Sequence, residues 1–224
     1  AGPMTDTTKN ALARRFRGYL PVIIDLETGG FDPLRNPVLE IGAVTVRLDE
    51  AGRLHPDEKY HFHVEPHPGL YIEPAALEFT GIDPTHPFRM AVSEHDALAE
   101  LFQHLRRAQK AAGCQRCVLV GHNAWFDLAF LRAAIERSEV KRAPFHAFTS
   151  FDTATLGGLA FGQTVLAKAC QAAGIAFDNR EAHSALYDAE RTAELFCLIV
   201  NRWRELGGWP IPNLPDIEVS SDEA

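Results

Sequence analysis

Three short segments in the first third of the chain have the hydrophobic pattern of β-strands. Residues 21–25, PVIID, form a continuous apolar run that ends in a carboxylate, which is typical of a strand buried on both faces. Residues 38–48 and 59–66 follow, and the turn-forming cluster DEAG at 49–52 favours an antiparallel hairpin between them. We therefore expect these three strands to come first.

The rest of the chain alternates helical and strand patterns. Apolar residues at spacings of three and four predict a helix that begins near Ser93, which can cap it, and ends at Gly113. A buried strand at 117–123 and an amphipathic helix at 124–138 follow. The remaining expected elements are a strand at 148–153 and helices at 164–174 and 184–206. This order predicts an α/β fold with a mixed five-stranded sheet, antiparallel on one side and parallel on the other, flanked by helices.

The same patterns indicate one domain with two short ends. The chain has 224 residues, 46% of them hydrophobic, so a single large core over residues 17–209 is expected. Residues 1–3 precede Met4 and resemble a cloning scar, and residues 4–16 form an N-terminal arm with basic residues. Residues 210–224 are acidic and broken by prolines, which predicts a disordered tail. Apolar runs are too short for a membrane helix and no secretory signal is evident, so we expect a cytoplasmic protein with no membrane partner.

Charge and cysteine content narrow the possible functions. The formal net charge of -8 argues against a protein that binds duplex nucleic acid by bulk positive charge, but not against a nucleic-acid enzyme with metal-binding acids. Cys114 and Cys117 have the spacing of half a zinc site or a redox dithiol. No second ligand pair follows at finger spacing, so reduced packing cysteines are favoured. His61, His63 and His67 are interpreted as surface or half-buried histidines.

Four acidic residues stand where strands end or helices begin. Asp25 and Glu27 end the first strand, and residues two apart in a strand point to the same side. This pattern alone is weak evidence, because it recurs at 216–218 in the tail. Asp127 and Asp188 lie among apolar residues, where a carboxylate needs a partner such as an arginine, a cap or a cation. Divalent cations would satisfy all four acids, and oxygen ligands favour Mg²⁺ or Mn²⁺ over zinc. Two such ions would suit cleavage of a phosphodiester.

Two histidines stand five residues before an acid, His122 before Asp127 and His183 before Asp188. Five residues turn a helix about 140° beyond a full turn, so histidine and acid do not share a helix face. We therefore expect His183 to precede its helix, after the polar loop at 178–182, exposed and free to act as a general base. His122 closes a buried strand and is interpreted as a structural histidine.

Three motifs together, DLET at 25–28, HNAWFD at 122–127 and HSALYD at 183–188, resemble the exonuclease motifs of the DEDDh 3′-to-5′ exonuclease family in order and separation. The resemblance implies a ribonuclease H-like fold and Mg²⁺-dependent hydrolysis by two ions, releasing nucleoside 5′-monophosphates. The residues that it implies for metal binding and catalysis are Asp25, Glu27, Asp127 and Asp188, with His183 as the base.

Longer stretches at 14–31, 151–170 and 201–210 are similar to a member of this family that removes 3′-terminal nucleotides of tRNA, trims stable RNA precursors and acts on single-stranded DNA ends. That likeness implies a head-to-tail homodimer, in which a basic patch on one subunit grips the RNA at the active site of the other. It implies base stacking by Phe31, Phe79, Phe126 and Phe148. The basic residues implied are Arg15, Arg17, Lys110, Arg116 and Lys141.

Several alternatives remain open at this point. Core packing is the alternative for the phenylalanines, above all for Phe126, which lies at helical spacing from Phe130. Solvated helix faces are the alternative for the basic residues. Ala75 stands in the segment implied to select the terminal base, which leaves the base preference open. A DNA-proofreading or oligoribonuclease-like exonuclease, and a non-catalytic RNA-binding module, are the competing functions.

Overall fold

The computed structural model describes residues 4–213, and its centre is a five-stranded sheet with the strand order β3-β2-β1-β4-β5. Strand β2 runs antiparallel to β1 and β3, whereas β4 runs parallel to β1 and β5. The strands are β1 (Tyr19–Thr28), β2 (Val38–Leu48), β3 (Leu54–His63), β4 (Arg116–Gly121) and β5 (Phe145–Asp152). The mixed sheet with an antiparallel hairpin on one side is therefore confirmed.

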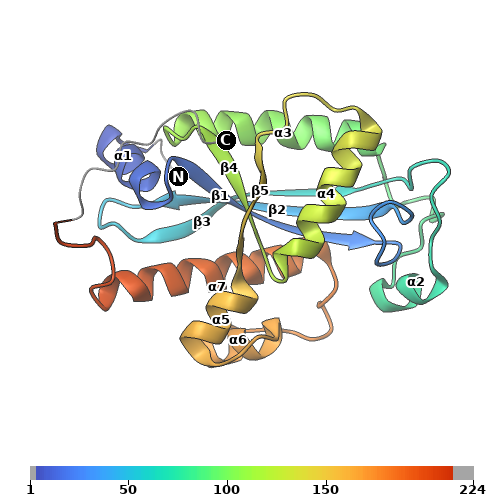
Figure 1. Ribbon diagram of the computed structural model, residues 1–224. Helices are drawn as coiled ribbons and strands as arrows, with labels where there is room; N and C mark the ends of the chain where they lie inside the picture. The colour runs from blue at the N-terminus through green and yellow to red at the C-terminus, as the bar shows by residue number, and fades with distance from the viewer. Residues whose placement is uncertain (1–3, 214–224) are drawn as a thin grey trace.

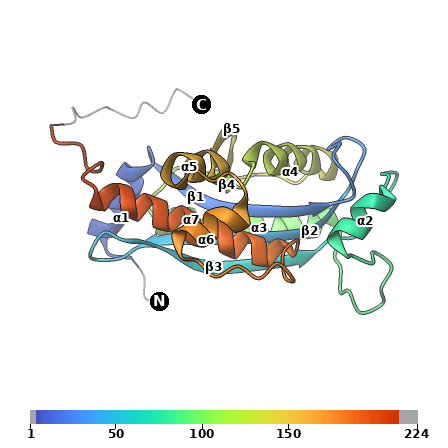
Figure 2. The same ribbon diagram turned by 90° about the horizontal axis from the view of Figure 1, so that it is seen from below.

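Helices cover both faces and both ends of this sheet. The helices are α1 (Asp6–Arg15), α2 (Pro74–Thr80), α3 (Glu94–Ala111), α4 (Ala124–Ser138), α5 (Thr153–Phe161), α6 (Leu166–Ala173) and α7 (Ala185–Glu205). Figure 1 shows α3 along one face of the sheet and α7 along the opposite face, with α1 and α2 at opposite ends. Viewed from below in Figure 2, α5 and α6 lie beside α7, and a small apolar cluster joins these three helices. Helix α4 packs against α3 and against β1, β4 and β5.

Helix α1 precedes β1, so the expectation that three strands come first is wrong. Helices α1, α2 and α5 are not indicated by the hydrophobic pattern. Helix α2 is short and buries no residue, so it has no apolar stripe. Helix α5 contains Gly157 and Gly158, which lower helix propensity, but the Asp152 carboxylate caps it by accepting from the backbone N–H of Ala154. Helix α1 lies in the expected N-terminal arm, and its Leu12 is fully buried in the core.

The four cysteines are free and buried, as expected for packing residues. Burial raises the pKa of Cys114 to about 11 and that of Cys117 to about 12, so neither thiol ionises readily. Residues 4–213 contain no helix long and apolar enough to cross a membrane. The expected cloning scar at 1–3, and residues 214–224 of the expected tail, lie outside the described residues.

Two strand pairings bring the sequence motifs together. Strand β1 pairs in parallel with β4, with Ile23 opposite Val120, so the carboxyl ends of these strands are neighbours. On the other side of β1, Glu27 pairs with Glu40 of β2. Helix α7 begins directly over β2, where a Cβ on Gly42 would lie 2.3 Å from the carbonyl oxygen of Ala185. The start of α7 is therefore held close to the end of β1.

Gly42→Ala should destabilise the protein, because the added methyl group would overlap with the backbone of α7 at Ala185. We expect the free energy of unfolding in urea to fall by about 1–3 kcal/mol, the usual cost of overpacking. Gly158→Ala is the matched control, because its methyl group would meet the Thr164 side chain at an ordinary 3.5 Å. That variant should gain about 0.5–1 kcal/mol from helix propensity. Equal stability of the two variants would contradict the close packing of α7 on β2.

Candidate active site

A cavity of about 820 Å³ opens where β1 and β4 end. Its wall is built from the end of β1 and the segment after it, helix α2, and the first turns of α4 and α7. The sequence-predicted residues that line it are Asp25, Glu27, Phe31, Phe79, Phe126, Asp127, His183 and Asp188. The fold thus gathers residues from all three motifs around one space.

The four acids are close together and largely shielded from solvent. Carboxylate oxygens of Asp25, Glu27 and Asp188 lie within 4.8 Å of one another. Glu27, Asp127 and Asp188 are only 7%, 3% and 9% exposed. Asp127 reaches β1 from helix α4, and its Oδ1 accepts a hydrogen bond from the backbone N–H of Leu26 at 3.0 Å. Leu26 lies between Asp25 and Glu27 in β1, so this bond holds the start of α4 next to both acids.

The turn from β4 into α4 is built to hold Asp127 in place. Gly121 ends β4, and a Cβ there would stand only 3.2 Å from Asp127 Oδ2. Asn123 takes the left-handed conformation, with φ of 60°. The carboxylate of Asp152 accepts from the backbone N–H groups of Asn123 at 2.9 Å and Ala124 at 3.1 Å. Because these N–H groups start the helix and would otherwise be unpaired, Asp152 fixes where α4 begins.

His183 lies just before α7 and is exposed, as the sequence predicts. Its backbone has a left-handed φ of 69°, and its N–H donates to Asp188 Oδ2 at 3.1 Å. Its ring lies 4.0 Å from the ring of Phe79. His122 differs, because its Nε2 lies 2.6 Å from the Thr164 carbonyl oxygen and its Nδ1 lies 2.8 Å from the Thr153 hydroxyl. Both ring nitrogens of His122 thus face protein groups, which supports the interpretation of His122 as a structural histidine, although it also lines the cavity.

Burial, followed by repulsion between the acids, makes this cluster reluctant to ionise. Burial is the first cause of the pKa of about 9 for Glu27, about 8 for Asp127 and about 6 for Asp188. The pKa of Asp25 is also raised well above its ordinary value, by burial and by the charges of Asp127 and Glu27. These are the shifts expected for carboxylates that share a site without a counter-charge.

The donor set fits a divalent cation. Asp25 Oδ2 and Asp188 Oδ1 are buried and have no hydrogen-bond partner. No lysine or arginine is found among the described residues that line the cavity. Unpaired buried carboxylates are costly, and clustered carboxylate oxygens are the ligands that hard divalent ions prefer. The arrangement therefore suits divalent metal binding by these acids.

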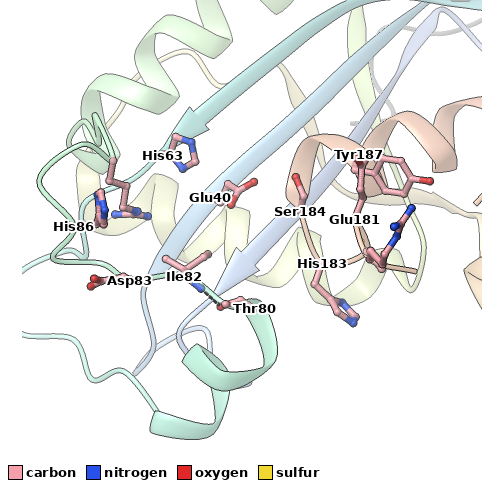
Figure 3. Close-up of a pocket in the computed structure, with 14 residues that line it drawn as sticks. Glu40, His63, Thr80, Ile82, Asp83, His86, Glu181, His183, Ser184 and Tyr187 are labelled. Atoms are coloured by element: carbon pink, nitrogen blue, oxygen red, sulfur yellow. Dashed lines mark hydrogen bonds between the residues drawn. The ribbon is translucent and has the colours of Figure 1, made fainter. Parts of the chain in front are cut away.

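Sequence reasoning did not single out Glu40, which connects the acid cluster to the start of α7. Glu40 is 5% exposed, and its Oε1 accepts from the backbone N–H of Ala185 at 2.9 Å and lies 2.9 Å from His61 Nε2. Figure 3 shows Glu40 between His63 and Ser184, with His183 further along the same loop. Burial opposes ionisation, but bonds from His61 and Ala185 bring the pKa of Glu40 below its ordinary value. A lone acid within the apolar run VLEIGAV is the signal that could have identified it.

Three of the four predicted stacking residues line the cavity, and Phe148 lies outside it. Phe31 and Phe79 line the cavity and are 89% and 63% exposed, whereas Phe126 is half-buried and packs 4.8 Å from Phe130. Phe148 is 67% exposed on β5, but it does not line this cavity, and its ring lies edge-on to His146 at 4.4 Å. Trp125, which sequence reasoning missed, also lines the cavity.

The predicted basic residues lie at the other end of the sheet. Arg116 starts β4 and pairs with Tyr19 at the start of β1. Asp25 lies six residues beyond Tyr19, which is about 20 Å along the strand. Of the predicted basic residues, Arg17, Lys110, Arg116 and Lys141 are exposed. Arg15 is half-buried, with its guanidinium over the rings of Phe16 at 4.9 Å and Trp209 at 4.7 Å.

Comparison with known proteins agrees with this site. Residues 22–196 match the exonuclease family RNase_T. The chain is 59% identical over 202 residues to ribonuclease T of Shewanella sp. (strain W3-18-1), which covers 90% of this chain and 91% of that protein. Its fold resembles Escherichia coli exonuclease I in complex with a dT13 oligonucleotide, with a TM-score of 0.64 and 20% identity. A second exonuclease I structure gives a TM-score of 0.63 and 19% identity.

Both exonuclease I matches cover 85% of this chain but only 43% of exonuclease I, so this chain spans about two fifths of that longer protein. The structural likeness therefore concerns the fold, which supports the expected ribonuclease H-like architecture. The family match extends from the middle of β1 to α7 and includes all four acids and His183. This chain belongs to the RNase_T family of exonucleases.

Proposed function

We propose that this chain is a 3′-to-5′ exoribonuclease that removes 3′-terminal nucleotides from tRNA and trims stable RNA precursors. The observation that supports this proposal most strongly is a cluster of four acids, of which Glu27, Asp127 and Asp188 are buried and Asp25 is half-buried, next to an exposed histidine in a cavity with exposed aromatic rings. The high identity to a ribonuclease T supports an RNA substrate. Because an aromatic ring stacks on any base, single-stranded DNA ends should be accepted as well.

The metal ligands in this proposal are Asp25, Glu27, Asp127 and Asp188, which would hold two Mg²⁺ ions, with Mn²⁺ as a substitute. The unpartnered oxygens of Asp25 and Asp188 support direct ligation by these two residues. Bound divalent ions would offset the charge of the phosphodiester and lower the pKa of a water molecule. Asp127 uses one oxygen to hold β1 and Asp188 uses one to hold the His183 loop, so each keeps its other oxygen for the site.

His183 is the proposed general base. It is exposed at the mouth of the cavity, next to Asp188, and would accept a proton from the attacking water. The bond to the 3′-oxygen of the shortened chain then breaks, and a nucleoside 5′-monophosphate leaves. His122 is less suited to this task, because protein groups already face both of its ring nitrogens.

The aromatic residues of the cavity would hold the last bases of the substrate. Phe31 and Phe79 present exposed faces, and Phe126 supports Phe31 with a ring contact at 6.3 Å. Stacking requires an unpaired base, so the proposed substrates have single-stranded 3′ ends. Glu73 and Ala75 also line the cavity and are candidates for contact with the terminal base.

A head-to-tail homodimer is part of the proposal. Arg17, Lys110, Arg116 and Lys141, with Arg15, would contact the body of the RNA, and Phe148 would stack on a base. In one chain the basic end lies about 20 Å along β1 from the acids, so a second copy would bring its basic end to this cavity. Four free, buried cysteines agree with action in a reducing cytoplasm.

The function is tested by incubating tRNA with a free CCA end, labelled at its 3′ or its 5′ terminus, with the protein and Mg²⁺. We expect the 3′ label to appear as mononucleotide, while the 5′ label stays on a slightly shortened tRNA, as read on a sequencing gel. Faster cleavage of dinucleotides than of tRNA would indicate an oligoribonuclease-like enzyme, and strong preference for DNA would indicate a proofreading one. Binding without release of nucleotide would indicate a non-catalytic module.

Metal binding by the acids should be visible without any substrate. At Mg²⁺ concentrations about 100 times the dissociation constant, linkage predicts about 2.7 kcal/mol of stabilisation, or about 5–10 °C in melting temperature. Asp25→Asn should remove most of this shift. Without metal, this variant should melt no lower than the wild type, because a repelling carboxylate is gone. Glu136→Gln, an exposed change on α4, should keep the full shift; an equal loss there would refute the assignment.

His183→Ala should lower kcat by about 100- to 10,000-fold, because a general base is lost. The Mg²⁺-induced rise in melting temperature should persist, because the acids are intact. Steady-state rates on 3′-labelled tRNA measure the first effect, and a thermal scan measures the second. Unchanged turnover in His183→Ala, together with a large loss in His122→Ala, would transfer the role to His122.

A further inference from the structure

Trp125 is an exposed tryptophan at the mouth of the acid cavity. It lies in the first turn of α4, two residues before Asp127, and its side chain is 68% exposed. It lines the cavity together with Phe31 and Phe79, which come from other segments of the chain. Single exposed apolar residues are common on protein surfaces, so exposure alone has little meaning. Trp125 differs from most exposed apolar residues because it lies beside the acids of the cavity.

The indole ring of Trp125 stands at the end of a row of three aromatic rings, with Phe126 in the middle and Phe31 at the other end. Adjacent residues of a helix point about 100° apart, so Phe126 turns inward onto Phe130 while Trp125 stays at the surface. The Trp125 ring meets Phe126 at 5.9 Å and 89°, and Phe126 in turn meets Phe31 at 6.3 Å. Trp125 therefore extends the aromatic wall of the cavity by one further ring.

The backbone under Trp125 is held before any substrate arrives. The two N–H groups that precede it, of Asn123 and Ala124, are both bound by the carboxylate of Asp152. Asp127, two residues later, is bonded to β1 through Leu26. Because this backbone is already held, it loses little conformational entropy when the exposed ring stacks on a base, and this favours binding.

We propose that Trp125 is a further base-stacking residue of this enzyme, which holds a base of the single-stranded 3′ segment at the mouth of the cavity. The proposal rests on the function proposed above and adds a contact to its substrate site. The ligand group is an unpaired nucleobase, because a flat apolar ring next to a phosphodiester site suits a base better than a sugar or a phosphate.

Trp203 provides a matched comparison within the same chain. It is 52% exposed in the last turn of α7, and it packs against Gly208, where an added Cβ would lie 2.1 Å from its ring. It lines no part of the acid cavity. It is also 15 residues beyond Asp188 in the same helix, which is about 22 Å. Its contact with Gly208 gives it a structural role that Trp125 lacks.

The test measures binding of a single-stranded RNA hexanucleotide in EDTA, which prevents cleavage; tryptophan fluorescence reports on Trp125, and the fluorescence anisotropy of 5′-labelled RNA gives the affinity of every variant. RNA should quench the emission of the wild type, and most of that quenching should be absent in Trp125→Phe. Trp125→Ala should weaken binding about tenfold, within the range for one stacked base, and Trp125→Phe should stay within about threefold of wild type. In Mg²⁺, Trp125→Ala should raise KM and leave kcat nearly unchanged. Trp203→Ala should bind RNA as the wild type does.

Two outcomes would overturn the proposal. One is wild-type affinity and KM in Trp125→Ala while the wild type trims labelled tRNA, which would refute stacking and leave the enzyme function intact. The other is a change of oligomeric state in Trp125→Ala with no loss of affinity per site, which would make Trp125 a protein contact. If the wild type neither binds RNA nor releases nucleotides, it is the proposed function that fails.

Discussion

The repulsion among four clustered carboxylates, three of them buried, is the constraint on which the rest of this structure depends. Carboxylates in a poorly solvated site raise one another's pKa, as seen for Asp25 and Glu27. A protein selected for stability alone would have little use for such a cluster, because apolar residues of similar size would pack there without the desolvation cost. The cluster therefore marks a place where the chain gives up stability for chemistry. Divalent cations are the natural means of offsetting that cost.

The surrounding fold keeps the acids in place through backbone N–H groups and avoids positive side chains. Leu26 donates to Asp127, and His183 donates to Asp188, so each of these acids joins its own helix to another segment of the site. Glu40 does the same for Ala185 at the start of α7. Fixing the acids with neutral donors, which satisfy only one oxygen of a carboxylate, leaves the other oxygens free for cations. An arginine in the cavity would have stabilised the apo protein but competed with the metal.

Much of this architecture can be predicted from the sequence, because it depends on local periodicity. Continuous and alternating apolar runs indicated the hairpin and the parallel strands, and the 100° step of a helix placed His183 outside α7. Helices α2 and α5 could not be predicted in this way, since α2 buries no apolar stripe and α5 contains two glycines. Glu40 was missed because its partner Ala185 is 145 residues away. Likewise, nothing local to Trp125 or Phe148 says which of them lines the cavity.

The distribution of charge explains how an acidic protein can act on a polyanion. Its net charge is -8, and the described residues that line the acid cavity include no lysine or arginine. In the proposed function, attraction would come from a local patch, which Arg17, Arg116 and their neighbours would provide at the opposite end of the sheet. This patch is remote from the acids of its own chain. Near the reacting phosphate, one chain would therefore hold the substrate through base stacking and bound metal ions alone. An enzyme that works as proposed would hold the last bases by their faces, which are present in every nucleotide. Selectivity for single-stranded ends would then follow from the requirement that those faces be free.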